Sequence, residues 1–168
     1  MITLTERSFT SEITIANVGL EGSIALTRAE IPGRSGWLVH GGTQHSLSLV
    51  FNYREKTQDR ILYDIVGGPT MGDYAGAKLG LSVGGFLGLY HKAQVTEPWK
   101  IEVLLFSNSS GKLHFWLRDS EGYRVSLYPR DPNIYAPAGI AASRYDYLAA
   151  GNNPGEPLIF SVKVPPLP

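Results

Sequence analysis

The chain contains no cysteine among its 168 residues. Disulfides, thiolate metal sites and cysteine nucleophiles are therefore excluded. The absence of cysteine does not identify the cellular compartment, because a secreted protein need not use disulfides.

An excess of charge of one sign is also lacking, since 15 basic residues balance 15 acidic ones. Without a large net field the chain has no means of attracting nucleic acid from a distance, and we expect no nucleic-acid partner. No apolar run reaches the roughly 18 residues of a membrane-spanning helix. The segment Met1–Arg7 lacks the basic and apolar regions of a secretory signal, so we expect a cytoplasmic protein or one that is exported by an unconventional route.

Turn formers and aromatic residues are abundant instead: the chain has 19 Gly, 11 Pro and nine Tyr. This composition is typical of an all-β protein. The length suits one domain, residues 1–168. A helix-poor chain must bury one sheet against another, so we predict an antiparallel two-sheet β-sandwich or jelly roll.

Alternation of apolar and polar residues predicts where the strands lie. It is clearest over His45–Tyr53, followed by a partner strand over 61–65. Three further runs over Lys100–Tyr128, separated by turns at 108–111 and 119–122, predict a three-stranded meander in which Ile101, Val103 and Leu105 begin the core face.

The middle run of this meander yields the main functional hypothesis. If Leu113, Phe115 and Leu117 face the core, the residues between them face the other way. The outward set from this run and the next would be His114, Trp116, Arg118, Arg124, Ser126 and Tyr128. An aromatic surface with cationic donors is suited to a glycan or another polar ligand, because the ring covers C–H groups while the donors bind hydroxyls. The alternative is that a loop or a second sheet simply packs on this face.

A long proline-rich segment, 129–157, follows the meander, and loops of this length usually cover or bind something. We expect Tyr135, Tyr145 and Tyr147 to add to the ligand-binding surface. Within this segment residues 141–150 predict one short helix, ending at Gly151.

Glycines recur at every fourth position between Gly76 and Gly88 in an apolar segment. One interpretation is a strand hairpin with its turn at Gly84–Gly85, in which the glycines make room for bulky neighbours. The other is an element that inserts into a membrane, as in a pore-forming protein or toxin component. The membrane-insertion candidates are Gly76, Gly80, Gly84, Phe86 and Gly88.

The remaining polar residues show no catalytic or metal-binding spacing. The four histidines, His40, His45, His91 and His114, lack ligand spacing, and we predict no metal and no cofactor. No nucleophile elbow, phosphate loop or acid/base pair is present, so we predict a protein that is not an enzyme. Whether calcium binds near Asp146, Asn152 and Asn153 stays open, since such residues are also ordinary turn formers.

The stretch Gly151–Gly155 with the strand after it is similar to the end of the bacterial calcium-dependent galactophilic lectins. In that family an Asn-Asn turn helps to bind the ion. This chain has Ala149 where a hydroxyl ligand would be wanted, so the similarity does not assign it to the family.

We therefore predict a non-catalytic binding module, with lectin-like recognition of a glycan or other polar ligand as the leading hypothesis. A membrane-active protein using segment 76–90 is the first alternative. A structural homo-oligomer subunit is the second, because near-zero net charge does little to keep copies apart.

Overall fold

The computed structural model describes residues 3–4, 6–26, 36–40, 47–91, 95, 97–128, 146–151 and 155–167. This part of the chain is nearly all β-structure, with one 3₁₀ turn, η1 (Gly72–Tyr74), and no α-helix. The strands are β1 (Phe9–Glu12), β2 (Thr14–Ile15), β3 (Gly22–Leu26), β4 (Leu38–His40), β5 (Ser48–Lys56), β6 (Ile61–Gly67), β7 (Lys78–Leu81), β8 (Leu87–Tyr90), β9 (Trp99–Phe106), β10 (Lys112–Arg118), β11 (Ser126–Leu127), β12 (Asp146–Ala149) and β13 (Ile159–Lys163).

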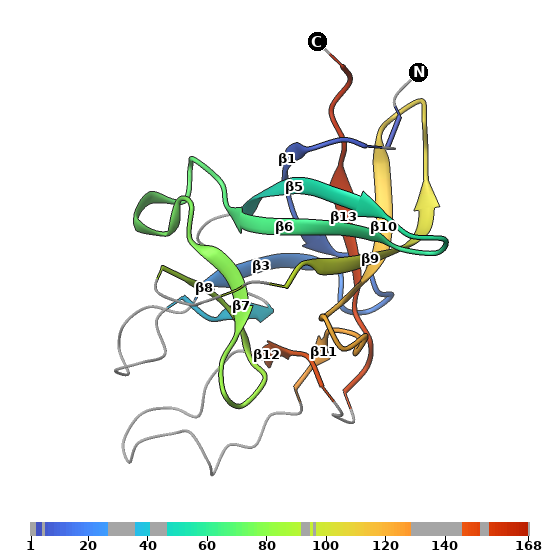
Figure 1. Ribbon diagram of the computed structural model, residues 1–168. Coiled ribbons are helices and arrows are strands. Elements are labelled where there is room, and N and C mark those ends of the chain that lie inside the picture. Colours follow the sequence, from blue (N-terminus) through green and yellow to red (C-terminus); the bar gives the residue numbers. More distant parts are fainter. Residues whose placement is uncertain are drawn as a thin grey trace, which may run out of the picture.

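All thirteen strands belong to one hydrogen-bonded path in the order β1-β5-β6-β9-β10-β13-β2-β3-β4-β12-β11, with the β7–β8 hairpin attached to β6 (Figure 1). Every pairing is antiparallel. Ile13 alone separates β1, which pairs with β5, from β2, which pairs with β13. The predicted all-β antiparallel class is confirmed. A division into two facing sheets is not confirmed, because the pairing forms one open path.

The core is made by the alternation that the sequence predicts. Along β5, Leu49 and Phe51 are buried, and along β10 Leu113, Phe115 and Leu117 are buried while the residues between them are not. Aromatic rings fill the centre: Phe51 stacks on Phe9 and meets Tyr63 and Phe115 edge to face. Such pairs contribute about 0.5–1.5 kcal/mol beyond the burial of their area.

The first strand of the predicted meander departs from strict alternation. Ile101 of β9 is buried, but Val103 and Leu105 are 40% and 50% exposed, so their predicted place in the core is wrong. A β-bulge between His114 and Phe115 inserts Leu104 into β9 as an extra residue, so Leu105 pairs with the outward-facing His114, whereas Val103 lies at the bulge and still pairs with the buried Phe115. A bulge disrupts the ladder and shifts the parity of the residues beyond it.

The third strand of the predicted meander is also different. Only Arg124 and Val125 stay beside β10, through a bridge to Arg118 and a hydrogen bond from the Val125 N–H to the Leu117 carbonyl. The chain then turns away as β11 and pairs with β12. The place beside β10 is taken by β13, whose Ser161 pairs with His114.

The predicted short helix over residues 141–150 is wrong in its C-terminal half. Asp146 to Ala149 form strand β12, where Asp146 and Tyr147 pair with His40 and Val39 of β4. Helix propensity is a weak preference, and the strand pairing with β4 and β11 overrides it here. Residues 141–145 lie outside the described part of the chain.

The glycine-rich segment forms the β7–β8 hairpin, as the strand interpretation predicts. Its turn differs in detail: the Gly85 N–H bonds to the Ser82 carbonyl, which places Val83 and Gly84 at the tip, and Gly85 alone takes a positive φ, +87°. Gly80 and Gly88 lie directly opposite each other. A methyl group on Gly88 would meet the Tyr90 ring at 2.8 Å, so this glycine makes room for a bulky neighbour.

Candidate functional site

The candidate site lies on the outer face of β10. His114, Trp116 and Arg118 alternate with the three core residues and are each half-buried, as their parity predicts. The strand is flanked on both sides, so Trp116 has Glu102 of β9 as one neighbour and Ile159 of β13 as the other. Trp116 therefore lies between an acidic and an aliphatic residue across the sheet.

A tight turn after β10 brings Arg124 onto the same face. The carboxylate of Asp119 accepts hydrogen bonds from the backbone N–H groups of Glu121 and Tyr123, and the Asp119 N–H bonds to the Tyr123 carbonyl at 3.0 Å. Gly122 supplies the positive φ of +93° that the reversal needs. The guanidinium carbon of Arg124 then lies 3.9 Å from the centroid of the Trp116 ring. This is a cation–π stack.

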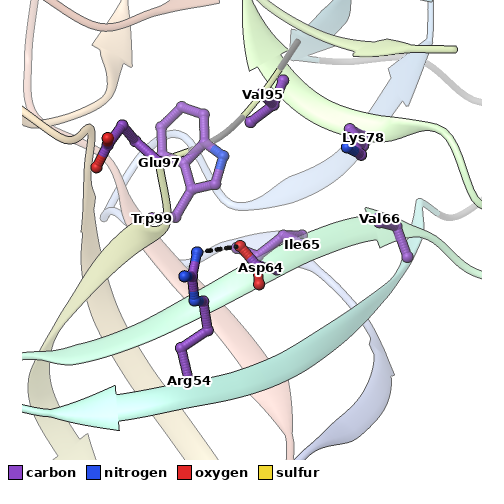
Figure 2. A pocket seen from close by; sticks show the side chains of 8 residues that line it. All are labelled: Arg54, Asp64, Ile65, Val66, Lys78, Val95, Glu97 and Trp99. Atoms are coloured by element: carbon purple, nitrogen blue, oxygen red, sulfur yellow. Dashed lines mark hydrogen bonds and ion pairs between the residues drawn. The ribbon is translucent and has the colours of Figure 1, made fainter. Parts of the chain in front are cut away.

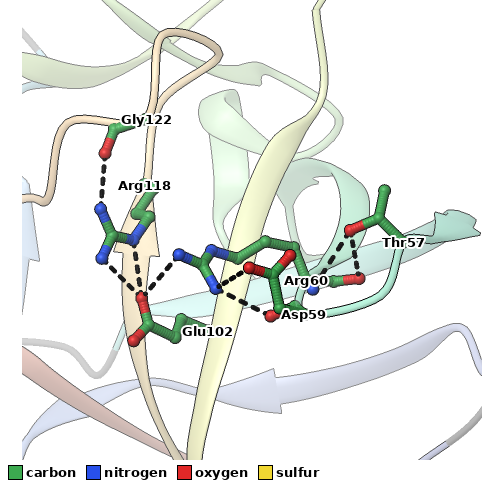
Figure 3. A network of polar contacts seen from close by, with 6 residues as sticks. All are labelled: Thr57, Asp59, Arg60, Glu102, Arg118 and Gly122. Atoms are coloured by element: carbon green, nitrogen blue, oxygen red, sulfur yellow. Dashed lines mark hydrogen bonds and ion pairs between the residues drawn. The ribbon is translucent and has the colours of Figure 1, made fainter.

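The other arginine of the face is held by an ion-pair network (Figure 3). Arg118 Nε donates to Glu102 Oε1 at 2.8 Å, and Arg118 Nη2 lies 2.6 Å from the same oxygen. Arg60 Nη2 approaches that oxygen from the other side at 3.1 Å. Arg118 Nη1 donates to the Gly122 carbonyl at 2.7 Å. Arg118 is therefore fixed in place and its charge is neutralised by Glu102.

Arg124 is not neutralised in this way. Its Nε is buried and donates to no acceptor within the described residues. None of the ion pairs found in that part of the chain includes it. A charged donor without an acceptor is costly, because the group has lost water and gained no partner. The Trp116 ring offsets some of this cost.

His114 completes the face on the side away from Arg118. Burial lowers the pKa of this histidine from its ordinary value, and the positive charge of Lys112 lowers it further. The imidazole is therefore neutral at pH 7 and offers one N–H donor and one acceptor.

Other predicted ligand residues lie elsewhere. Ser126 is buried, and Tyr128 and Tyr147 both meet the Phe86 ring edge to face, in a cluster that also holds Trp37. Tyr128 and Tyr147 are therefore not brought onto the Trp116 face. Phe86, a predicted membrane-insertion residue, is only 6% exposed. Tyr135, Tyr145, Asn152 and Asn153 lie outside the described residues.

Glu102 and Arg60 were not predicted from the sequence as members of the site. Alternation within the 100–106 run places Glu102 on the outer face, so the sequence pattern could have identified Glu102 as a neighbour of the site. Arg60 comes from the turn between β5 and β6, and no pattern in the sequence relates that turn to β10.

A separate hollow of about 230 Å³ lies between β6, β7 and the start of β9 (Figure 2). Its rim carries the ion pair between Arg54 and Asp64, with an N–O distance of 3.4 Å, and both side chains are nearly half exposed. Lys78 and Glu97 add one charge of each sign, over a floor that includes the indole of Trp99. Exposed ion pairs contribute little, and the balanced charges of this rim select no class of ligand.

No family model, curated protein or solved structure matches this chain. Within the described ranges, no three histidine or acidic side chains are grouped so as to hold a metal ion. No helix in that part of the chain has the length and apolar character needed to cross a membrane.

Proposed function

We propose that this protein is a non-catalytic binding module that recognises a glycan through the outer face of β10. The observation that carries the proposal is the half-buried indole of Trp116, which the guanidinium of Arg124 contacts at 3.9 Å from its centroid. A ring that is already ordered loses little entropy on binding. It presents an apolar surface beside polar groups, which is what a sugar needs.

The surroundings of the ring support the same class of ligand. His114 and Ser161 lie side by side on adjacent strands and supply a neutral donor and acceptor pair and a hydroxyl. Leu105, which pairs with His114, is half exposed and extends the apolar surface. Sugars combine apolar C–H patches with hydroxyl groups, so mixed surfaces of this kind suit them.

The test is a glycan array followed by titration calorimetry with Trp116→Ala and Trp116→Phe. We expect Trp116→Ala to abolish binding and Trp116→Phe to retain part of it, because phenylalanine keeps an aromatic ring. Thermal unfolding of both variants checks that the fold is intact. Absence of binding to every glycan on the array would contradict the proposal.

The membrane-active alternative has one supporting observation. Val83 at the tip of the β7–β8 hairpin is fully exposed, and Leu81 is 38% exposed. The glycine spacing itself has a structural explanation, since Gly80 and Gly88 pack against Tyr90. Dye release from liposomes by the wild type, lost in Val83→Asp, would favour this alternative over glycan binding.

The homo-oligomer alternative also has one supporting observation. Val103, Leu104 and Leu105 are consecutive exposed apolar residues on β9, and apolar patches of this kind often mark interfaces. Light scattering distinguishes it: a mass above the monomer that falls to the monomer in Leu104→Lys would place an interface on β9.

A further inference from the structure

We infer that the glycan bound on β10 is acidic and that its carboxylate or sulfate group pairs with Arg124. This inference rests on the proposed function and names the ligand class for the same site. Its basis is the half-buried charge of Arg124, for which the described part of the chain supplies no carboxylate partner.

Arg124 is the one arginine near Trp116 that forms no ion pair within the described residues. Two acidic side chains, Asp59 and Glu102, pair with two arginines, Arg60 and Arg118. Arg124 lies beside Arg118 through a backbone bridge and has no carboxylate partner among the described residues. Asp119 is close in sequence, but its Oδ1 accepts two backbone N–H groups of the turn. Arg124 therefore carries its charge beside the Trp116 ring without a carboxylate in direct contact among the described residues.

The geometry of Arg124 suits an anion better than a neutral hydroxyl. The contact with Trp116 holds the guanidinium beside the ring, and a planar guanidinium presents parallel N–H groups to a planar or tetrahedral acid group. Because Nε is covered, a ligand would meet the two terminal nitrogens. Charge-assisted hydrogen bonds are about twice as strong as neutral ones, so the acid group would dominate selectivity.

Trp116 explains why the ligand would be a glycan and not a free anion. A free sulfate or phosphate has no apolar face and gains nothing from an indole. A sugar ring bearing an acid group can cover the ring edge while its acid group reaches the adjacent guanidinium. Glu102 does not repel it, because two guanidinium groups share its Oε1 atom.

The experiment compares matched pairs of glycans at constant ionic strength: 3′-sialyllactose with lactose, and a sulfated heparin oligosaccharide with its desulfated form. For at least one pair we expect the acidic member to bind about tenfold more tightly, a difference of about 1.4 kcal/mol. Arg124→Gln should abolish this preference and leave the affinity for the neutral member unchanged. Arg124→Lys keeps the charge and should retain part of it. Arg54→Gln, which removes an arginine on β5, is the matched control and should bind as the wild type does.

The outcomes separate this inference from the proposed function. Equal affinity for both members of every pair, or a preference that survives Arg124→Gln, overturns the acidic ligand and leaves glycan binding standing. If inorganic sulfate displaces the acidic glycan at equal concentration, the site binds anions in general and the inference is wrong. Absence of binding by any glycan overturns both proposals. Should Arg124→Gln fail to fold, the comparison rests on Arg124→Lys, which must weaken the preference.

Discussion

The guanidinium carbon of Arg124 lies over the indole of Trp116, 3.9 Å from the ring centroid, although the two residues are on opposite sides of a turn. We predict that the pair is coupled by about 0.5–1 kcal/mol, the range measured for partly exposed cation–π pairs. A double-mutant cycle of Trp116→Ala and Arg124→Ala, read as urea unfolding, measures this coupling. Additive effects of the two changes would mean that the stack contributes nothing to stability.

Tyr63 leads to a second prediction, because its hydroxyl is buried in the aromatic core and has no hydrogen-bond partner within the described residues. Burial raises the pKa of this tyrosine to about 12, with the neighbouring Tyr53 adding to the rise. Tyr63→Phe removes the unpaired hydroxyl and keeps the ring. We expect it to raise the free energy of unfolding by about 1 kcal/mol.

The alkaline side gives a further check on Tyr63. The phenolate form of Tyr63 is disfavoured in the folded state. The titration of Tyr63 therefore leaves the free energy of unfolding unchanged below pH 10 and lowers it as the pH rises towards 12. Tyr63→Phe should lose less stability than the wild type over this window. Tyr123→Phe, which removes an exposed hydroxyl, is the control and should change little. A destabilised Tyr63→Phe would show that the hydroxyl has a partner in solution.

Gly88 carries the third prediction. Its added methyl group would lie 2.8 Å from the Tyr90 ring and 3.0 Å from the Gly36 carbonyl oxygen, closer than ordinary van der Waals contact. We expect Gly88→Ala to lower the free energy of unfolding by about 1–3 kcal/mol. Val83→Ala at the exposed tip of the same hairpin should stay within about 0.5 kcal/mol of the wild type. Equal effects of the two changes would refute the packing role of Gly88.

The sequence predicted the outer face of β10 because the alternation there is complete. Successive residues of a strand point to opposite faces, so burial of Leu113, Phe115 and Leu117 places Trp116 on the outer face. Alternation does not say which strands are neighbours, however. That is why β13, more than forty residues further along the chain, could not be placed beside β10.

The remaining errors have local causes. The bulge at Leu104 depends on how β9 is paired and not on its own residues. The strand at Asp146–Ala149 exists because β4 and β11 offer it partners, and no local pattern shows that. The stack of Arg124 on Trp116 follows from a turn that reverses the chain at Gly122, so only the placement of both residues on one face could be predicted.

His114 carries the last prediction, which concerns pH. Burial and Lys112 lower the pKa of the folded-state imidazole below its ordinary value of 6.5. The unfolded chain therefore takes up a proton at a higher pH than the folded chain does, and stability is lost as the pH falls below 6.5. His114→Gln lacks this group. We expect its urea midpoint to fall less than that of the wild type between pH 7.5 and pH 5.5, and an equal fall in both proteins would show that His114 titrates alike in the two states.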